Sequence, residues 1–312
     1  MLVAAAWLPL PGMAQPWPDR PIRLIVPFPP GGGTDILARV VGQKLSETLG
    51  QIVAVENRGG AGGTLGADAA AKSAPSGYTF LMVSASYAVG PSLYKLPFDP
   101  LQDLIPVSLV ASVPFALVAY PGLSANNVNE LVALARSRPG EINFASSGNG
   151  SAPHLAGELF AMRTGTRLVH IPFKGGAPAL TEVLSGRVQL LFSTVTQALP
   201  QIKAGKLKVI GLSSKQRSEA LPGVPTIDES GLPGFDLPDW FGVLAPRGTP
   251  EAIVARMSEE IARHIRNSDL KGRLADEGFE PIGSSPAEFG RTLRKDVEEF
   301  ARVVKSAGVR ID

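Results

Sequence analysis

Short apolar runs alternate with longer amphipathic segments along most of the chain. Residues 22–28 (IRLIVPF) form one such run, and residues 35–49 after it repeat apolar positions at the spacing of a helix. This alternation predicts a mostly parallel sheet covered by helices. By the same criteria we expect strands at 22–28, 52–55, 79–83, 142–145, 168–171, 188–192 and 207–212, and helices at 35–49, 65–71, 152–163, 177–185, 195–204, 249–267 and 285–308.

Two stretches, 107–120 and 240–245, are continuously apolar, and Pro or Gly bounds each of them. They bracket a segment that has its own strand–helix alternation. A chain that leaves one α/β unit, builds a second and returns needs two such crossings, which suits closure around a ligand. We therefore expect two α/β lobes on a two-strand hinge, one from residues 16–117 plus 242–312 and one from residues 118–241. The alternative is one large sheet with both stretches as central strands.

The first residues have features of an export signal. Residues 2–10 (LVAAAWLPL) are apolar but too short to span a bilayer, and small residues precede a cleavage point after Ala14. The basic segment that normally opens such a signal is missing. We therefore interpret residues 1–15 as a truncated signal peptide, the alternative being a mere apolar tail. The mature chain is expected in the periplasm.

Composition removes several classes of function. The chain has 30 basic and 28 acidic residues without a run of like charge, which disfavours nucleic acid as a partner. It has no cysteine, so thiolate metal sites, disulfides and cysteine nucleophiles are excluded. Three scattered histidines do not predict a zinc site, no P-loop occurs, and GAGGTLG at 60–66 has the wrong spacing for a dinucleotide loop. We expect no metal and no cofactor.

The strongest local signal is VPFPPGGGTD at 26–35, where a strand ends, a glycine-rich loop follows and a helix begins. Glycines allow main-chain N–H groups to line a concavity, and the start of a helix adds unpaired donors and the positive end of its dipole. This arrangement binds a carboxylate or a phosphate. Thr34 and Asp35 have the alternative role of capping the helix, which leaves the three consecutive glycines unexplained. The candidate ligand contacts here are Phe28, Gly32, Gly33, Thr34 and Asp35.

Two similar junctions occur later in the chain. SSGNGSAPH at 146–154 follows one predicted strand, and IPFKGGA at 171–177 spans the end of the next. The carboxyl ends of parallel strands are where open α/β sheets bind ligands, so the three loops are expected to surround one small anion with neutral donors. The alternative is three ordinary turns, in which glycine and serine are common. The candidate contacts are Ser147, Gly150, Ser151, His154, Gly175 and Gly176.

Three further polar residues are candidate contacts by position. Ser84 and Ser86 follow the strand at 79–83 and are expected to donate into the same cleft. Asp239 lies at the second crossing, where its carboxylate would bind an amine or a hydroxyl of the ligand. We expect its neighbour Trp240 to pack in the core of the hinge. The alternative is that Trp240 packs against the ligand.

A hydrolase is the rival class, because Ser151 and His154 are close enough in sequence for a nucleophile and its base to meet. The GxSxG turn of many serine hydrolases is absent, since neither glycine position around Ser151 holds a glycine. We interpret His154 as a packed or hydrogen-bonding residue and His170 as structural, and we expect His264 on the surface. No catalytic residue is assigned, and the chain is not expected to be an enzyme.

Five ordered motifs run through the chain. They are VPFxxGGxxD, ENR followed by GAGG, SGxGSxxH, FKGGxPAL and APRGTP, at residues 26–35, 56–63, 147–154, 173–180 and 245–250. Together they resemble the extracytoplasmic solute receptors of tripartite tricarboxylate transporters, also called Bug receptors. The resemblance covers residues 17–312, with one departure at Gly59, where the family commonly has proline.

The resemblance implies a type II periplasmic-binding-protein fold and the capture of a small organic carboxylate between two lobes. It implies that the loops at 28–35 and 147–154 hold the carboxylate, and that the receptor delivers its solute to a membrane permease. We expect a monomer. Which carboxylate is bound stays open, because the other end of the cleft carries no motif. A ligand sensor that feeds a signalling system is the remaining alternative.

Overall fold

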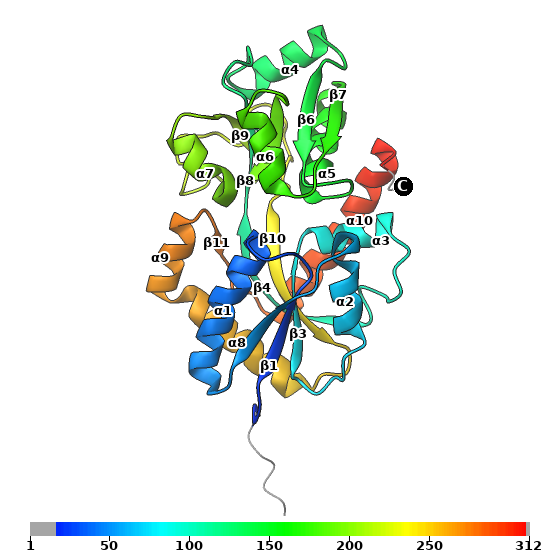
Figure 1. Ribbon diagram of the computed structural model, residues 1–312, viewed down its shortest axis with the longest axis vertical. Helices are drawn as coiled ribbons and strands as arrows, with labels where there is room; N and C mark the ends of the chain where they lie inside the picture. Colours follow the sequence, from blue (N-terminus) through cyan, green and yellow to red (C-terminus); the bar gives the residue numbers. More distant parts are fainter. Residues whose placement is uncertain (1–16, 310–312) are drawn as a thin grey trace, which may run out of the picture.

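Two β-sheets, each covered by helices, make up residues 17–309, the part of the chain that the computed structural model describes (Figure 1). The first sheet has the strand order β11-β4-β10-β3-β1-β2, and the second has the order β7-β6-β8-β5-β9. The prediction of two α/β units is confirmed, and the alternative of one large sheet is wrong. The predicted signal peptide, residues 1–15, lies outside the described residues.

We call the two units lobe 1 and lobe 2. Lobe 1 contains β1 (Ile22–Val26), β2 (Val53–Asn57), β3 (Thr79–Ser84), β4 (Leu104–Val113), β10 (Asp239–Pro246) and β11 (Glu280–Pro281), with α1 (Gly33–Leu49), the 3-10 helix η1 (Ala61–Gly63), α2 (Thr64–Ala71), α3 (Ser86–Leu93), α8 (Glu251–Arg266), α9 (Ser268–Asp276) and α10 (Pro286–Ala307). Lobe 2 contains β5 (Phe115–Ala119), β6 (Ile142–Ser146), β7 (Leu168–Pro172), β8 (Leu190–Thr194) and β9 (Lys208–Leu212), with α4 (Val128–Ser137), α5 (Ala152–Thr164), α6 (Gly176–Leu184) and α7 (Val195–Lys203). The sequence pattern did not predict η1, α3, α4, α9 or the short β11.

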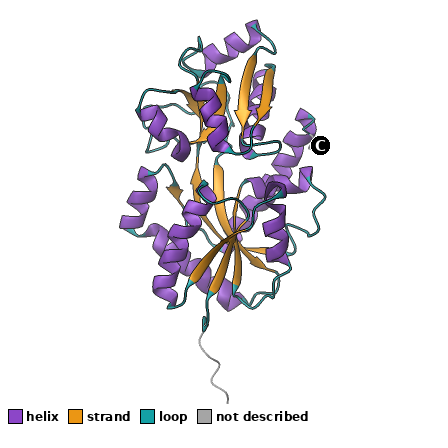
Figure 2. Cartoon of the chain, in the orientation of Figure 1, coloured by secondary structure: helices purple, strands orange, loops and turns teal. Residues whose placement is uncertain are grey.

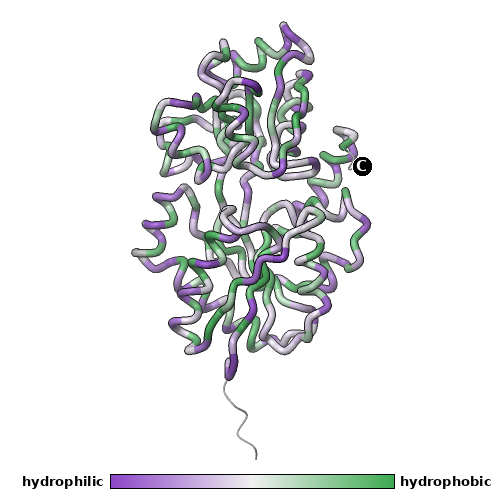
Figure 3. Tube along the Cα trace, viewed as in Figure 1, coloured by the Kyte–Doolittle hydropathy of each residue, from purple (hydrophilic) through white to green (hydrophobic). Residues whose placement is uncertain are grey.

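The central strands are apolar along most of their length because helices cover both faces of each sheet. Every residue of β3 and of β10 is buried, and strands buried on both faces read as continuous apolar runs. Figure 3 shows hydrophobic stretches inside both lobes and hydrophilic positions spread over the outer helices and loops. No helix within residues 17–309 combines the length and the apolar character needed to cross a membrane.

The chain passes between the lobes at Pro114 and again just before β10. β4 ends and β5 begins on either side of Pro114, which has no N–H to donate to a ladder. Asp239, the first residue of β10, pairs with the last residue of β4. Phe115 already belongs to the second sheet and Asp239 to the first. Both crossings therefore lie slightly earlier than the boundaries predicted after residues 117 and 241.

Ser213 ties the two crossings together. Its hydroxyl accepts the N–H of Phe115 at 2.9 Å and donates to the carbonyl of Leu237 at 2.9 Å. Its main chain adds a bond to each of the same two residues, at 2.8 Å and 2.9 Å. Because Ser213 is fully buried, the two connecting segments keep a fixed spacing at the hinge.

Helix α10 is a third link between the lobes. It starts with a capping box in which Ser285 and Glu288 exchange hydrogen bonds, and it packs against α3 of lobe 1 and α5 of lobe 2. At the hinge, Trp240 Nε1 donates to Asp296 Oδ2 of this helix at 2.6 Å. Figure 1 shows α10, in red, rising from lobe 1 to the level of α5.

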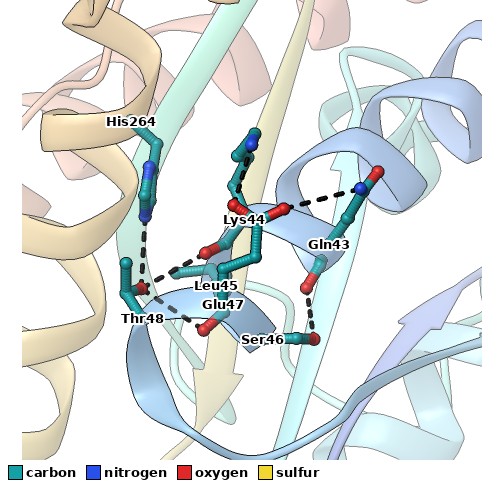
Figure 4. Close-up of polar contacts among 8 residues, drawn as sticks. Gln43, Lys44, Leu45, Ser46, Glu47, Thr48 and His264 are labelled. Atoms are coloured by element: carbon teal, nitrogen blue, oxygen red, sulfur yellow. Dashed lines mark hydrogen bonds and ion pairs between the residues drawn. The ribbon is translucent and has the colours of Figure 1, made fainter.

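The last turn of α1 packs against α8 through a polar contact that the sequence did not predict. His264 Nε2 lies 3.2 Å from Thr48 Oγ1, and His264 is half-buried (Figure 4). Burial is the main cause of the lowered pKa of the His264 ring. The expectation of a surface histidine is wrong, because α1 covers this side of α8.

Candidate ligand-binding site

The strand-to-helix junctions of the two lobes face each other. β1 is parallel to β2 and β3, and β6 is parallel to β7 and β8. In each lobe the carboxyl ends of these strands point toward the other lobe (Figures 1 and 2). The first junction, at 28–35, therefore lies opposite the second, at 147–154, and the third, at 173–176. A shared site requires this arrangement.

The lobes also touch at this level. Gly150, in the loop before α5, lies so close to α3 that a Cβ added to it would collide with the side chain of Leu93. A second contact places Gly278, between α9 and β11, against Val195 at the start of α7. The first contact brings the second junction directly to the edge of lobe 1.

Asp35 organises the first junction from inside α1. Its buried carboxylate accepts hydrogen bonds from Gly31 N–H at 2.9 Å, from Arg39 Nε at 3.0 Å and from Asn57 Nδ2 at 2.9 Å. Burial alone would raise the pKa of this carboxyl, but the bonds from Arg39, Gly31 and Asn57 hold it below its usual value. Asp35 is thus an ionised anchor of the loop, which favours the structural alternative for this residue.

The first junction keeps free donors beyond the one that Asp35 uses. Helix α1 starts at Gly33 with Gly32 as its N-cap, and no side chain caps it. Within residues 17–309, the N–H groups of Gly32, Gly33 and Thr34 have no acceptor. They remain available to an anion at the positive end of the α1 dipole.

Two stacked histidines support the second junction. His154, the third residue of α5, accepts the N–H of Gly150 at its Nδ1 over 3.0 Å. Its ring stacks on that of His170 from β7, with centroids 3.6 Å apart and planes 8° from parallel. His170 Nε2 lies 2.6 Å from Ser146 Oγ, which in turn accepts the N–H of Gly148 at 3.1 Å. The pair therefore supports the loop through both of its glycines.

The hydrogen bonds define the orientation of the first ring, and burial disfavours a charge on the second. Because Gly150 donates to Nδ1 of His154, the ring proton sits on Nε2, which lies 3.5 Å from Glu158 Oε1. Burial, with a smaller contribution from His154, lowers the pKa of His170 to about 3. A proton on His170 would place a charge in a poorly solvated position against the other ring.

The donors that stay free in lobe 2 differ from those expected from the sequence. The N–H of Gly150 is used by His154, and that of Gly175 donates to the carbonyl of Ser147 at 3.2 Å. With φ of 72° and 116°, these two glycines shape their loops. In the described part of the chain, the N–H groups of Ser147, Asn149 and Gly176 lack acceptors.

The hinge holds the loop after β3. Asp239 is buried and its Oδ1 accepts the N–H of Ala85 at 3.1 Å, and burial raises its pKa to about 7. Asp239 therefore positions this loop with one of its oxygens. The hydroxyls of Ser84 and Ser86 lie 3.1 Å apart, and Ser84 is buried. Trp240 packs edge-on against Phe289, in the core role that we favoured.

A shallow hollow lies beside the first junction. Phe28 and Ser86 are the two predicted contacts that reach it. Its lining consists of Pro27, Phe28, Gly62, Gly63, Thr64, Ala67, Val83, Ser86, Tyr87, Gly90, Leu96 and Phe98. All of these residues belong to lobe 1.

Ser151 and His154 are not arranged as a nucleophile and its base. Ser151 Oγ accepts the main-chain N–H of His154 at 3.4 Å and caps α5, while the two ring nitrogens face Gly150 and Glu158. Ser151 thus has a helix-capping role. Among residues 17–309, no group of His, Asp and Glu side chains is placed to hold a metal ion.

Known proteins match the chain over nearly its whole length. The model of the tripartite tricarboxylate transporter family receptors, TctC, matches residues 37–309. This chain belongs to the TctC family. Protein BugT of Bordetella pertussis is 40% identical to it over 314 residues, which cover 100% of this chain and 96% of BugT.

Solved structures of TctC-type receptors share the fold. The periplasmic binding protein BugD has a TM-score of 0.83 and 35% identity, covering 94% of this chain and 99% of BugD. Rpa4515 of R. palustris with adipate has a TM-score of 0.87 and 35% identity, covering 94% and 99%. MatC of Rhodopseudomonas palustris with bound malate has a TM-score of 0.82 and 33% identity, covering 92% and 100%. The resemblance and the periplasmic-binding-protein fold inferred from the sequence are confirmed.

Several residues that hold the junctions of this TctC-family chain in place were not predicted from its sequence. Asn57 belongs to the ENR motif, but its bond to Asp35 exists only because β2 lies beside β1. Leu93 gave no signal, since its contact with Gly150 joins two lobes. The partnership of His154 with His170 needs the β6–β7 pairing, which the sequence pattern does not specify.

Proposed function

We propose that this chain is a periplasmic receptor that binds a small organic carboxylate between its lobes and delivers it to a membrane permease of the tripartite tricarboxylate transporter type. It works as a monomeric binding protein without catalysis. The observation that carries the proposal is the set of acceptor-free N–H groups at the facing first and second junctions. Adipate and malate in Rpa4515 and MatC support the same class of ligand.

Neutral donors suit reversible capture of an anion. The start of α1 favours negative charge without a fixed cation in an empty cleft, where an unpaired charge would be costly. Arg39, one turn further along the same helix, is already paired with Asp35 at 3.0 Å. A carboxylate that contacts both lobes stabilises the closed arrangement by its higher affinity for that arrangement.

Gly32→Val tests this assignment. Gly32 has an ordinary φ of −84°, and a Cβ added there meets no atom within 4 Å, so the side chain obstructs the start of α1 without straining the fold. In thermal-shift titrations with acetate, hexanoate, adipate, malate and citrate, at least one carboxylate should raise the Tm, and its neutral amide should not. Gly32→Val should weaken the binding of that carboxylate at least about ten-fold, a loss of roughly 1.4 kcal/mol.

Gly223→Val is the matched control. Gly223 is an exposed turn glycine that also has free space for a Cβ and no positive φ, so this variant should bind like the unmodified chain. If no carboxylate raises the Tm, or if Gly32→Val binds as tightly as Gly223→Val, the proposed function is contradicted.

A further inference from the structure

Asp239 is a buried acid at the edge of lobe 1 that faces lobe 2 (Figure 1). It is the first residue of β10, and because β10 runs antiparallel to β3, it lies beside the carboxyl end of β3. Its Oδ1 accepts the N–H of Ala85, in the loop after β3, at 3.1 Å. Asp239 is 9% exposed, against 3% for Trp240 and 2% for Phe241, so it is the most accessible of the first three residues of β10.

The pairing of β10 places Asp239 on the same side of the sheet as the start of α1. Side chains alternate along a strand, and the register of β10 with β4 is regular from Asp239 to Phe241. Trp240 points to α10, where it donates to Asp296. Asp239 and Phe241 therefore point to the opposite face, where a Cβ added to Gly33 would lie 3.3 Å from Phe241 Cζ. Asp239 thus shares this face with the free donors of the first junction.

A single small solute can reach both groups. Two residues of a strand span roughly 7 Å, which separates Asp239 from Phe241, the residue whose ring contacts Gly33. The N–H groups of Gly32 and Gly33 are available to a carboxylate at one end of the solute. A second polar group, a few bonds further along the solute, would meet the carboxyl of Asp239.

Asp239 has no cation beside it. Within residues 17–309 it pairs with no Lys, Arg or His side chain. Burial raises its pKa to about 7, and the main-chain N–H groups of Ala85 and Trp240 offset this only in part. A buried carboxylate gains most from a hydrogen-bonded partner of opposite charge. The missing partner at this position is therefore a cation that the solute brings.

We propose that Asp239 binds an ammonium group of the solute, so that the chain prefers amino acids to carboxylates that carry a methyl group in place of the amine. This inference rests on the proposed function. The junctions hold the carboxylate of the solute, and Asp239 accepts a charge-assisted hydrogen bond from its ammonium. Each charged end of the bound zwitterion then has a partner, and the charge of Asp239 is compensated as well.

Three pairs of solutes test this preference, because the members of each pair differ only by an ammonium in place of a methyl group. The pairs are alanine with isobutyrate, β-alanine with butyrate, and γ-aminobutyrate with valerate, and they move the amine stepwise away from the carboxylate. Isothermal titration calorimetry of the unmodified chain at neutral pH should show the preference in at least one pair. In that pair the amine should bind at least about ten-fold more tightly than its methyl counterpart.

Asp239→Asn tests the location. Asparagine keeps an oxygen for the N–H of Ala85 but carries no charge, so the ratio of amine to methyl affinity should fall toward one. Asp296→Asn is the matched control. Burial raises the pKa of both carboxyls, but Asp296 is bonded to Trp240 on the other face of β10. This variant should keep the ratio of the unmodified chain.

The outcomes separate this inference from the proposed function. If neither these solutes nor the carboxylates of the thermal-shift panel bind, the proposed function itself fails and the inference falls with it. If carboxylates bind but no amine exceeds its methyl counterpart, the receptor assignment stands and the inference is overturned. A preference that persists in Asp239→Asn overturns it as well.

A second measurement decides if Asp239→Asn does not fold. The carboxyl ¹³C signal of Asp239 in the unmodified chain should move toward the position of an ionised carboxylate on saturation with the preferred amine. A signal that stays in place would overturn the inference.

Discussion

The first junction, in lobe 1, and the second, in lobe 2, share a detail that their sequences do not reveal. In each, the third residue of the following helix reaches back four positions to a glycine N–H, Asp35 to Gly31 and His154 to Gly150. Both side chains therefore fix the loop that precedes the helix, in the manner of a capping box. The loop needs a hydrogen-bond acceptor at this point, and either a carboxylate or an imidazole supplies one.

The two acceptors differ in charge and in their surroundings. Asp35 is ionised, and Arg39 and Asn57 hold it in place. His154 is neutral and is held by stacking on His170. The first junction should therefore keep its geometry over a wide range of pH above the lowered pKa of Asp35, whereas the second should depend on the His170 ring staying neutral. The comparison thus separates an anchor held by ionic hydrogen bonds from one held by ring stacking.

Removing the carboxylate of Asp35 should have the largest effect. Asp35→Ala removes a buried carboxylate that accepts three hydrogen bonds, from Gly31, Arg39 and Asn57, and we expect the free energy of unfolding to fall by about 2–3 kcal/mol. Urea denaturation measures this change. Glu47→Ala is the control on the same helix, because Glu47 is 48% exposed and pairs with Lys44 at the surface (Figure 4), and it should leave the urea midpoint almost unchanged. Equal costs for the two variants would show that Asp35 is no anchor.

Acid should weaken the second junction by a smaller amount. The pKa of His170 is about 3 in the folded chain and about 6.5 in an unfolded one, so between these values the unfolded state binds more protons. The stabilising contribution is therefore complete above pH 6.5 and declines as the pH falls toward 3. Because the ring is only half-buried, we expect about 1–2 kcal/mol of this decline between pH 7 and pH 4.5.

The comparison with His170→Gln isolates that contribution. Urea midpoints measured at several pH values should decline less steeply in His170→Gln than in the unmodified chain, since glutamine does not titrate. Parallel curves for the two proteins would mean that the histidine stack does not set the acid sensitivity of lobe 2.

The sequence predicted the two α/β units because strands buried on both faces read as continuous apolar runs, but it did not predict that β5 and β10 pair antiparallel with both of their neighbours. β3 and β10 are apolar at almost every position, and the glycine loops stand out between such strands and amphipathic helices. We predicted the first crossing between the lobes after residue 117, too far along the chain, because residues 107–120 read as one apolar stretch. Only the pairing shows that Pro114 divides this stretch between the two sheets.

Hydrogen-bond partners within the site were harder to predict. Gly150 and Gly175 were expected to donate to a ligand, but their N–H groups are used by His154 and Ser147. Such bonds depend on side-chain direction and on which strands are neighbours. The spacing of residues along the sequence specifies neither. Asp239 is similar, since its bond to Ala85 joins residues far apart in the chain.

The most direct test of the account follows the amide signals of the two junctions by ¹H–¹⁵N NMR during titration with the tightest-binding carboxylate of the thermal-shift panel. If main-chain N–H groups of both lobes hold one carboxylate, the signals of Gly32, Gly33, Ser147 and Asn149 should shift together with a single dissociation constant. The signal of Gly272, on the exposed face of α9, should stay in place. Saturable shifts confined to one lobe, or to residues outside both junctions, would contradict the central claim.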